Sequence, residues 1–189
     1  MSRYVLSLIL LLMPLSAYAG AGLTYEQLEE ISVSPERLDG DFTQQKYLKA
    51  LDTSLLSTGV FSYQRGKSIR WNTEEPIKNE LLMTPDAIVN RQNGHELVRL
   101  ETDSNPAVTI LSEIFFSVLT AEWDKLSGYF DLSGTANGEQ WSAELLPVDA
   151  AVLQVITRVE LKGNDLLREV ILHEKGGNRT TIRFENLSQ

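Results

Sequence analysis

The stretch Gly59–Pro76, GVFSYQRGKSIRWNTEEP, has the pattern of two β-strands joined by a tight turn. Successive side chains of a strand point to opposite faces, so Phe61, Tyr63 and Arg65 share one face of the first strand. The second strand carries its apolar side chains in the same alternation, at Ile69 and Trp71. The pattern therefore predicts a hairpin with an aromatic and aliphatic face that ends in an arginine.

Arg65 is the unusual member of this face, because a charge beside apolar groups is costly unless it finds a partner or water. One interpretation is that Arg65 meets a partner group at the rim of an apolar cavity. The other is that it lies in the turn, with its stem on the sheet and its charged head in water. Periodicity alone favours the second interpretation.

The N-terminus has the features of a secretory signal peptide. A basic Arg3 precedes the apolar run Val5–Leu15, and Ala17-Tyr18-Ala19 fits the small-x-small cleavage rule. The run is shorter than the roughly 20 residues that a membrane span needs. We therefore expect residues 1–19 to be removed and residues 20–189 to form one domain, with an uncleaved membrane anchor as the alternative.

Charge and cysteine content limit the environment and the partners of the chain. The net charge is −9, and removing Arg3 makes it more negative. Such a chain repels nucleic acid and anionic membrane surfaces, so we expect no nucleic-acid partner. The chain has no cysteine, so it depends on packing instead of disulfides and cannot carry a lipid anchor on a cysteine. These features predict an exported protein that is free of a lipid anchor, and we expect it to be a monomer.

The remainder of the chain reads mainly as strands, with a short helix predicted from Tyr25 to about Ser32. Asn93-Gly94 is a strong hairpin signal. Apolar residues recur at helical spacing from Val108 to Leu119 and cover more than a narrow stripe of that helix. About ten or eleven antiparallel strands cannot stay flat. The predicted fold is mainly β, an incomplete antiparallel barrel closed by helices, one of which is either ordinary core or the lid of an apolar cavity.

The C-terminal half contains five further predicted strands separated by glycine- and asparagine-containing turns. One of them, near Gln154–Leu161, alternates clearly and predicts a half-buried strand. We expect its two faces to be Val155, Thr157, Val159 and Leu161 on one side and Ile156, Arg158 and Glu160 on the other.

Motifs for catalysis are missing from the sequence. His95 and His173 are the only histidines, and neither has metal-ligand spacing to a neighbour. There is no nucleophile elbow, phosphate loop or dinucleotide fingerprint. We therefore predict no catalytic residue, no metal site, no cofactor and no enzymatic activity. A paired-carboxylate hydrolase stays open, because its residues need not be close in sequence.

The chain resembles the periplasmic outer-membrane lipoprotein carrier family, LolA. The resemblance extends from Leu38 to about Thr84, and beyond Asn90 it is one of element order. The motifs that carry it are Phe42-Thr43-Gln44-Gln45, Gly59-x-Phe61-x-Tyr63-x-Arg65, Arg70-Trp71-x-Thr73-x-x-Pro76 and Leu81-Leu82-Met83. One departure is Gly66, because the family usually has proline directly after the arginine.

This resemblance implies an incomplete barrel whose helices cover a hydrophobic cavity for acyl chains. It implies that Arg65 bonds to backbone groups of the lid and keeps the empty form closed, which reverses the preference from periodicity. Trp71 matches a cavity-lining tryptophan of the family. We expect the cavity to be lined on the sheet side by Phe42, Phe61, Tyr63, Ile69 and Trp71, and on the lid side by Ile110, Ile114, Phe115 and Leu119.

The implied function is that of a periplasmic carrier that shields the acyl chains of lipoproteins, or of another exported lipid, between the inner and outer membranes. Its partners would be the acylated cargo, an inner-membrane releasing complex and an outer-membrane acceptor. The alternative is an envelope module that is not a carrier and holds a protein partner on its sheet.

Overall fold

A computed structural model describes residues 22–101 and 106–189 of the chain. The expected signal peptide at residues 1–19 lies outside the described residues. Within the two described ranges, no helix is both long and apolar enough to cross a membrane.

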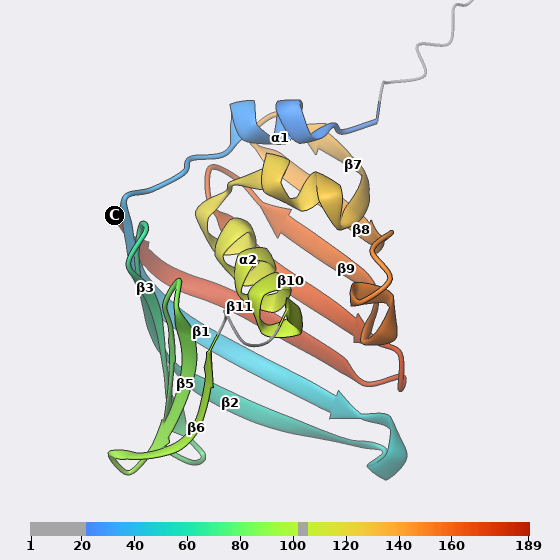
Figure 1. The fold of residues 1–189 in the computed structure, drawn as a ribbon. Coiled ribbons are helices and arrows are strands. Elements are labelled where there is room, and N and C mark those ends of the chain that lie inside the picture. Colours follow the sequence, from blue (N-terminus) through green and yellow to red (C-terminus); the bar gives the residue numbers. More distant parts are fainter. Residues whose placement is uncertain (1–21, 102–105) are drawn as a thin grey trace, which may run out of the picture.

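One antiparallel sheet dominates the described part of the chain (Figure 1). Its eleven strands follow the order β6-β5-β4-β3-β2-β1-β11-β10-β9-β8-β7. They are β1 (Arg37–Leu48), β2 (Thr53–Gln64), β3 (Ser68–Glu75), β4 (Asn79–Met83), β5 (Ala87–Gln92), β6 (His95–Glu101), β7 (Phe130–Asn137), β8 (Gln140–Pro147), β9 (Ile156–Gly163), β10 (Leu167–Glu174) and β11 (Arg179–Ser188). Strands β6 and β7 do not pair with each other, so the sheet curves without closing.

Two α-helices cover this sheet within the described residues. Helix α1 (Tyr25–Ile31) begins with a capping box of Thr24 and Gln27 and lies at one end of the sheet. Helix α2 (Pro106–Thr120) lies across the concave face, in front of β10 and β11 (Figure 1). Short 3₁₀ turns form η1 (Lys49–Leu51), η2 (Trp123–Gly128) and η3 (Val152–Gln154). The predicted fold, a mainly β incomplete barrel with a helical lid, is confirmed.

The hairpin that opened the sequence analysis forms in the expected register. Phe61 pairs with Trp71 and Tyr63 with Ile69, so all four share the concave face. The turn is closed by Gly66, whose φ of 65° is a backbone conformation that favours glycine. The paired strands place the aromatic side chains of this hairpin beneath α2.

The expected alternation of β9 is wrong at its start. Val155 caps η3 and is 53 % exposed, whereas Ile156, the first strand residue, is only 5 % exposed. The cause is a register irregularity in the β9–β10 pairing between His173 and Glu174. The inward side chains are therefore Ile156, Val159 and Leu161.

Candidate apolar cavity beneath α2

An apolar cavity of about 150 Å³ lies between α2 and the C-terminal half of the sheet. Its lining comes from α2, from the start of β7 and from β8 to β11, and its only side-chain hydroxyl belongs to Thr180. The lining residues are Ile114, Phe115, Val118, Leu119, Phe130, Leu145, Ile156, Val159, Val170, Leu172, Thr180, Ile182 and Phe184. A space of this character excludes water and favours hydrocarbon.

Three of the four expected lid residues, Ile114, Phe115 and Leu119, line this cavity. The fourth, Ile110, packs against the core without belonging to the cavity wall. Helical geometry explains the grouping, because positions three and four apart lie on one face of α2. The cavity-facing side of the helix is therefore continuous along its C-terminal half.

The five expected sheet-side residues form a packed cluster beside the cavity. Each of them is at most 6 % exposed. Trp71 stacks on Phe42 with ring centroids 4.0 Å apart and meets Phe115 and Phe184 edge to face, each at 6.0 Å. The cluster members are Phe42, Phe61, Tyr63, Ile69 and Trp71.

Phe115 and Phe184 connect this aromatic cluster to the cavity, because both line the cavity and both contact Trp71. In the present geometry the cluster is the solid wall on one side of the space. Contact of the five sheet-side residues with an acyl chain stays a prediction.

Sequence reasoning missed the sheet-side lining, which comes from the C-terminal strands. Val170 pairs with Ile182 across β10 and β11, and Leu172 pairs with Thr180, so all four face α2. Alternation within each strand could have predicted which side chains share a face. It could not predict the register between the strands, and the register decides which side chains touch.

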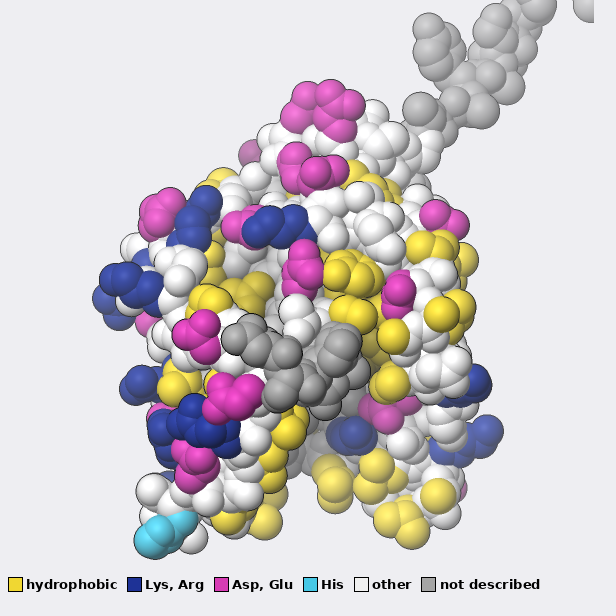
Figure 2. Space-filling view, viewed as in Figure 1, with side chains coloured by type: hydrophobic (Ala, Val, Ile, Leu, Met, Phe, Trp, Pro, Cys, Tyr) yellow, Lys and Arg dark blue, Asp and Glu magenta, His cyan; other side chains and the backbone are white. Residues whose placement is uncertain are grey.

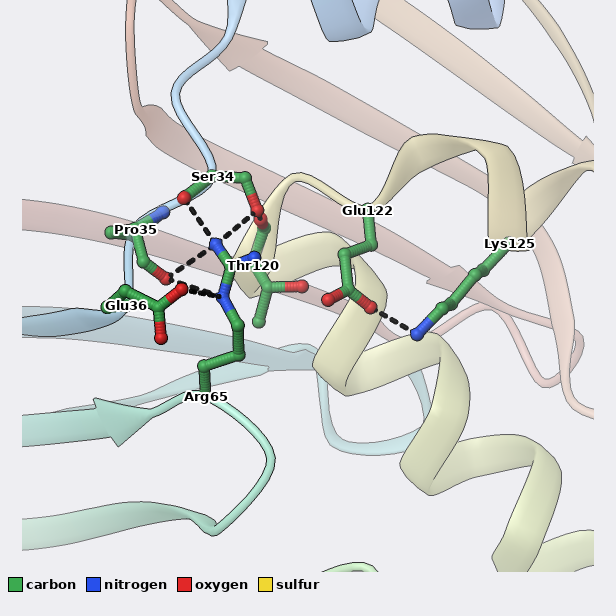
Figure 3. A network of polar contacts seen from close by, with 7 residues as sticks. All are labelled: Ser34, Pro35, Glu36, Arg65, Thr120, Glu122 and Lys125. Atoms are coloured by element: carbon green, nitrogen blue, oxygen red, sulfur yellow. Dashed lines mark hydrogen bonds and ion pairs between the residues drawn. The ribbon is translucent and has the colours of Figure 1, made fainter.

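Arg65 is the centre of a polar network at the C-terminal end of α2 (Figure 3). Its guanidinium donates to the carbonyl of Pro35 at 3.1 Å, to the Ser34 hydroxyl at 2.9 Å and to the Ser34 carbonyl. It also forms an ion pair with Glu36 at 3.2 Å. Glu36 is 84 % exposed, so this pair is weak and the hydrogen bonds dominate.

Ser34 connects this network to the helix. Its hydroxyl accepts from Arg65 and donates to the carbonyl of Thr120, the last residue of α2, at 2.6 Å. Carbonyl groups at a helix C-terminus have no partner within the helix, so such a bond stabilises the end. Arg65 thus bonds directly to the segment between α1 and β1 and reaches α2 through Ser34. We call Arg65, Ser34 and the Thr120 carbonyl the latch.

A second contact joins α2 to the C-terminal half of the sheet. The Tyr129 hydroxyl, just before β7, donates to the Glu113 carboxylate at 2.6 Å. This hydrogen bond is the largest cause, and burial of the phenol the second, that raise the pKa of Tyr129 to about 12. Tyr129 therefore keeps its proton and its hydrogen bond throughout the physiological pH range.

The opposite side of α2 carries buried hydroxyl groups that lack hydrogen-bond partners. It borders a cleft of about 360 Å³ next to the β2–β3 turn. Three buried hydroxyls there, those of Ser112, Ser117 and Thr120, have no hydrogen-bond partner in the described structure. Each such group costs about 1–3 kcal/mol when it is buried unpaired. Helix α2 therefore packs against apolar groups on one side and has unpaired buried hydroxyls on the other.

The structure places the two histidines away from the cavity. His95 is exposed on β6, and His173 Nε2 lies 2.7 Å from Glu160 among the ionic pairs of β9 and β10. Among the described residues, no three His, Cys, Asp or Glu side chains gather in a metal-binding arrangement.

The described residues thus form an open antiparallel sheet with a helix over an apolar cavity. The chain belongs to the family of the outer membrane lipoprotein carrier protein LolA, whose sequence profile matches residues 34–189. No curated protein sequence matches the chain.

Several solved structures match the chain at low identity. A LolA superfamily protein from Nitrosomonas europaea is 11 % identical, with 87 % of this chain and 90 % of that chain covered and a TM-score of 0.45. A putative outer membrane lipoprotein-sorting protein domain from Vibrio parahaemolyticus is 10 % identical, with coverage of 88 % and 91 % and a TM-score of 0.43. The Pseudomonas aeruginosa MucA/MucB complex matches at 13 % identity, with coverage of 80 % and 51 % and a TM-score of 0.43.

Ser34→Ala removes the hydroxyl that joins Arg65 to α2. We expect faster amide hydrogen exchange in the last turn of α2 and a loss of about 1 kcal/mol in the free energy of unfolding. Mass-detected exchange measures the first effect and urea unfolding the second. Ser133→Ala, on an exposed position of β7, is the control; equal exchange in both variants would contradict the latch.

Proposed function

We propose that this protein is a periplasmic carrier that shields the acyl chains of lipoproteins, or of another exported lipid, while they move from the inner to the outer membrane. The observation that carries the proposal is the apolar cavity between α2 and β7–β11. Membership of the LolA family supports it. An inner-membrane releasing complex and an outer-membrane acceptor are the partners that such a carrier requires.

The cavity has the chemistry that an acyl chain needs. Each methylene that leaves water gains about 0.8 kcal/mol. An apolar lining offers this gain without competing hydrogen bonds, and Thr180 at its edge is the sole side-chain hydroxyl among the lining residues. Binding of hydrocarbon therefore follows from burial alone, and needs no charged or catalytic group.

The size of the cavity supports a change of shape on loading. Its volume of about 150 Å³ matches cavities that hold a benzene-sized molecule. A long acyl chain is several times larger, so the described geometry corresponds to the closed, empty state. Loading requires α2 to move away from the sheet, with Phe115 leaving its contact with Trp71.

The contacts of α2 suit a helix that must move. The latch and the Glu113–Tyr129 bond hold it closed. The unpaired hydroxyls of Ser112, Ser117 and Thr120 oppose this closure, because movement would let water reach them. A small difference between the two states lets cargo open the protein without binding so tightly that it cannot leave.

Phe115→Asp places a carboxylate in the cavity wall. Binding of a fluorescent fatty-acid probe should be abolished, because the charge would have to be buried beside hydrocarbon. The matched control is Phe116→Asp, since the neighbouring Phe116 borders the cleft on the other side of α2. Probe titration measures binding and circular dichroism checks that both variants fold; equal binding in the two would show that the cavity is not the binding site.

Arg65→Leu removes the charged centre of the latch, whose hydrogen bonds are worth about 1.5–3 kcal/mol. The empty closed state loses this stabilisation, so cargo should still enter but leave about tenfold more slowly or worse. Transfer of a labelled acylated peptide to acceptor vesicles measures release. Arg70→Leu, on the outer face of β3, is the control. A normal release rate for Arg65→Leu would remove the latch from the mechanism.

Ser117→Ala removes one unpaired buried hydroxyl from the closed state. The free energy of unfolding should rise by about 1 kcal/mol, and probe affinity should fall because opening no longer hydrates a hydroxyl. Ser54→Ala, on an exposed position of β2, should change neither quantity. Urea unfolding and probe titration measure both; a destabilised Ser117→Ala protein would mean that this hydroxyl is bonded in solution.

The second candidate function is a module that holds a protein partner on its sheet. It is favoured by strand β6, an edge strand whose residues are all exposed, including Leu97 and Val98 at 58 % and 48 %. An unpaired edge can accept another strand. A protein with this function alone should take up no hydrophobic probe, so the Phe115→Asp titration separates the two candidates.

A further inference from the structure

The tip of the β1–β2 hairpin exposes three leucines. Leu51 in η1 is 70 % exposed, and Leu55 and Leu56 at the start of β2 are 55 % and 60 % exposed. Figure 2 shows hydrophobic side chains over this tip, on one side of the hollow below α2. Neighbouring exposed leucines are costly in water, and such patches commonly mark interaction sites.

Three cations lie at the same end of the sheet as these leucines. Lys49 belongs to η1, Lys175 lies in the neighbouring β10–β11 turn and Arg179 begins β11; all three are exposed. The Lys49 backbone N–H donates to Asn178 at 3.1 Å, which joins the tip to that turn. We call Leu51, Leu55, Leu56, Lys49, Lys175 and Arg179 the hairpin-tip surface.

Two carboxylates, those of Asp52 and Glu174, lie near this surface. Asp52 accepts from the Tyr47 hydroxyl at 2.9 Å, and Glu174 pairs with Lys46 at 3.1 Å. No ion pair is found for Lys49, Lys175 or Arg179 among the described residues. The tip is thus locally cationic in a chain whose net charge is −9.

The hairpin-tip surface continues directly from the proposed cavity. Thr180 of the cavity wall pairs with Lys46 across β11 and β1, and Lys46 pairs with Leu55 across β1 and β2. Residues directly opposite one another in a sheet share a face, so this row follows the concave surface from the cavity to the tip. A chain leaving the cavity in this direction would pass Lys46, which is paired with Glu174, and then meet Leu55.

We propose that the hairpin-tip surface docks the protein on an anionic lipid surface, with the three leucines entering the headgroup layer. The inference rests on the proposed carrier function, since docking here would bring the cavity row to the membrane from which an acyl chain is taken or to which it is delivered. Leucine side chains supply the apolar contribution. Lys49, Lys175 and Arg179 supply attraction to anionic headgroups.

The negative net charge does not forbid this docking. Screening in physiological salt limits electrostatic interactions to about 8 Å. The membrane therefore senses mainly the charges of the surface facing it, where cations outnumber carboxylates. Acidic side chains elsewhere would instead favour one orientation, with the tip towards the lipid.

The test is co-sedimentation of the purified protein with protein-free vesicles of phosphatidylethanolamine, with and without phosphatidylglycerol. The protein should sediment with the anionic vesicles, less in high salt, and Leu51→Ser/Leu55→Ser/Leu56→Ser should bind at least about tenfold more weakly. Lys49→Glu/Lys175→Glu/Arg179→Glu should lose the preference for phosphatidylglycerol. The control is Val33→Ser, because Val33 is 41 % exposed and precedes the opposite end of β1.

Failure of the wild-type protein to bind anionic vesicles would overturn the proposal, as would equal binding by the leucine variant. Binding only to vesicles that contain membrane proteins would also overturn it, in favour of a protein partner. The fatty-acid probe is measured on the same samples. Probe binding without vesicle binding would leave the carrier function standing, whereas vesicle binding without probe binding would support docking and refute the carrier.

Discussion

The packing of α2 on the concave face of the sheet is the contact on which the rest of the structure depends. The sheet remains open, with β6 and β7 as its two edges, so no strand pairing joins its two halves across the concave face. Phe115 fills that position by meeting Trp71 on one side and lining the cavity on the other. The same helix therefore completes the hydrophobic core and borders the space that we assign to cargo.

These two roles of α2, in the core and at the cavity, explain why some of its polar groups are hydrogen-bonded and others are not. A core helix would normally satisfy its buried hydroxyls, because each unpaired one is costly. Here Ser112, Ser117 and Thr120 are buried without a partner, while the helix end is secured by Ser34 and Arg65. The proposed carrier function requires that this helix leave the cavity while the strand pairing of the sheet is kept.

The concave and outer faces of the sheet also differ in chemical character. Near α2 the concave face is apolar and closely packed, as at Phe42 and Phe184. Towards the hairpin tip the same face changes to Lys46 and then Leu55. The outer face of β9 and β10 carries ion pairs such as Lys162 with Glu169, which lower the pKa of that carboxyl and keep this side in water. An apolar ligand thus has one side of the sheet available to it.

The sequence by itself determined the strand-rich fold, the hairpin of Phe61 and Trp71, and the apolar character of α2, because alternation and helical spacing are local properties. Periodicity placed Arg65 at the end of the apolar face and favoured its head in water; only the family resemblance indicated a bonded partner. Only the tertiary structure decided which partner, since Ser34 lies far from Arg65 along the chain and meets it through the β1–β2 pairing. The cavity wall of Val170, Leu172 and Ile182 likewise depends on strand register, and the irregularity near His173 exposed Val155 where alternation predicted burial. Contacts between distant segments arise from register and curvature, which no single stretch of sequence contains.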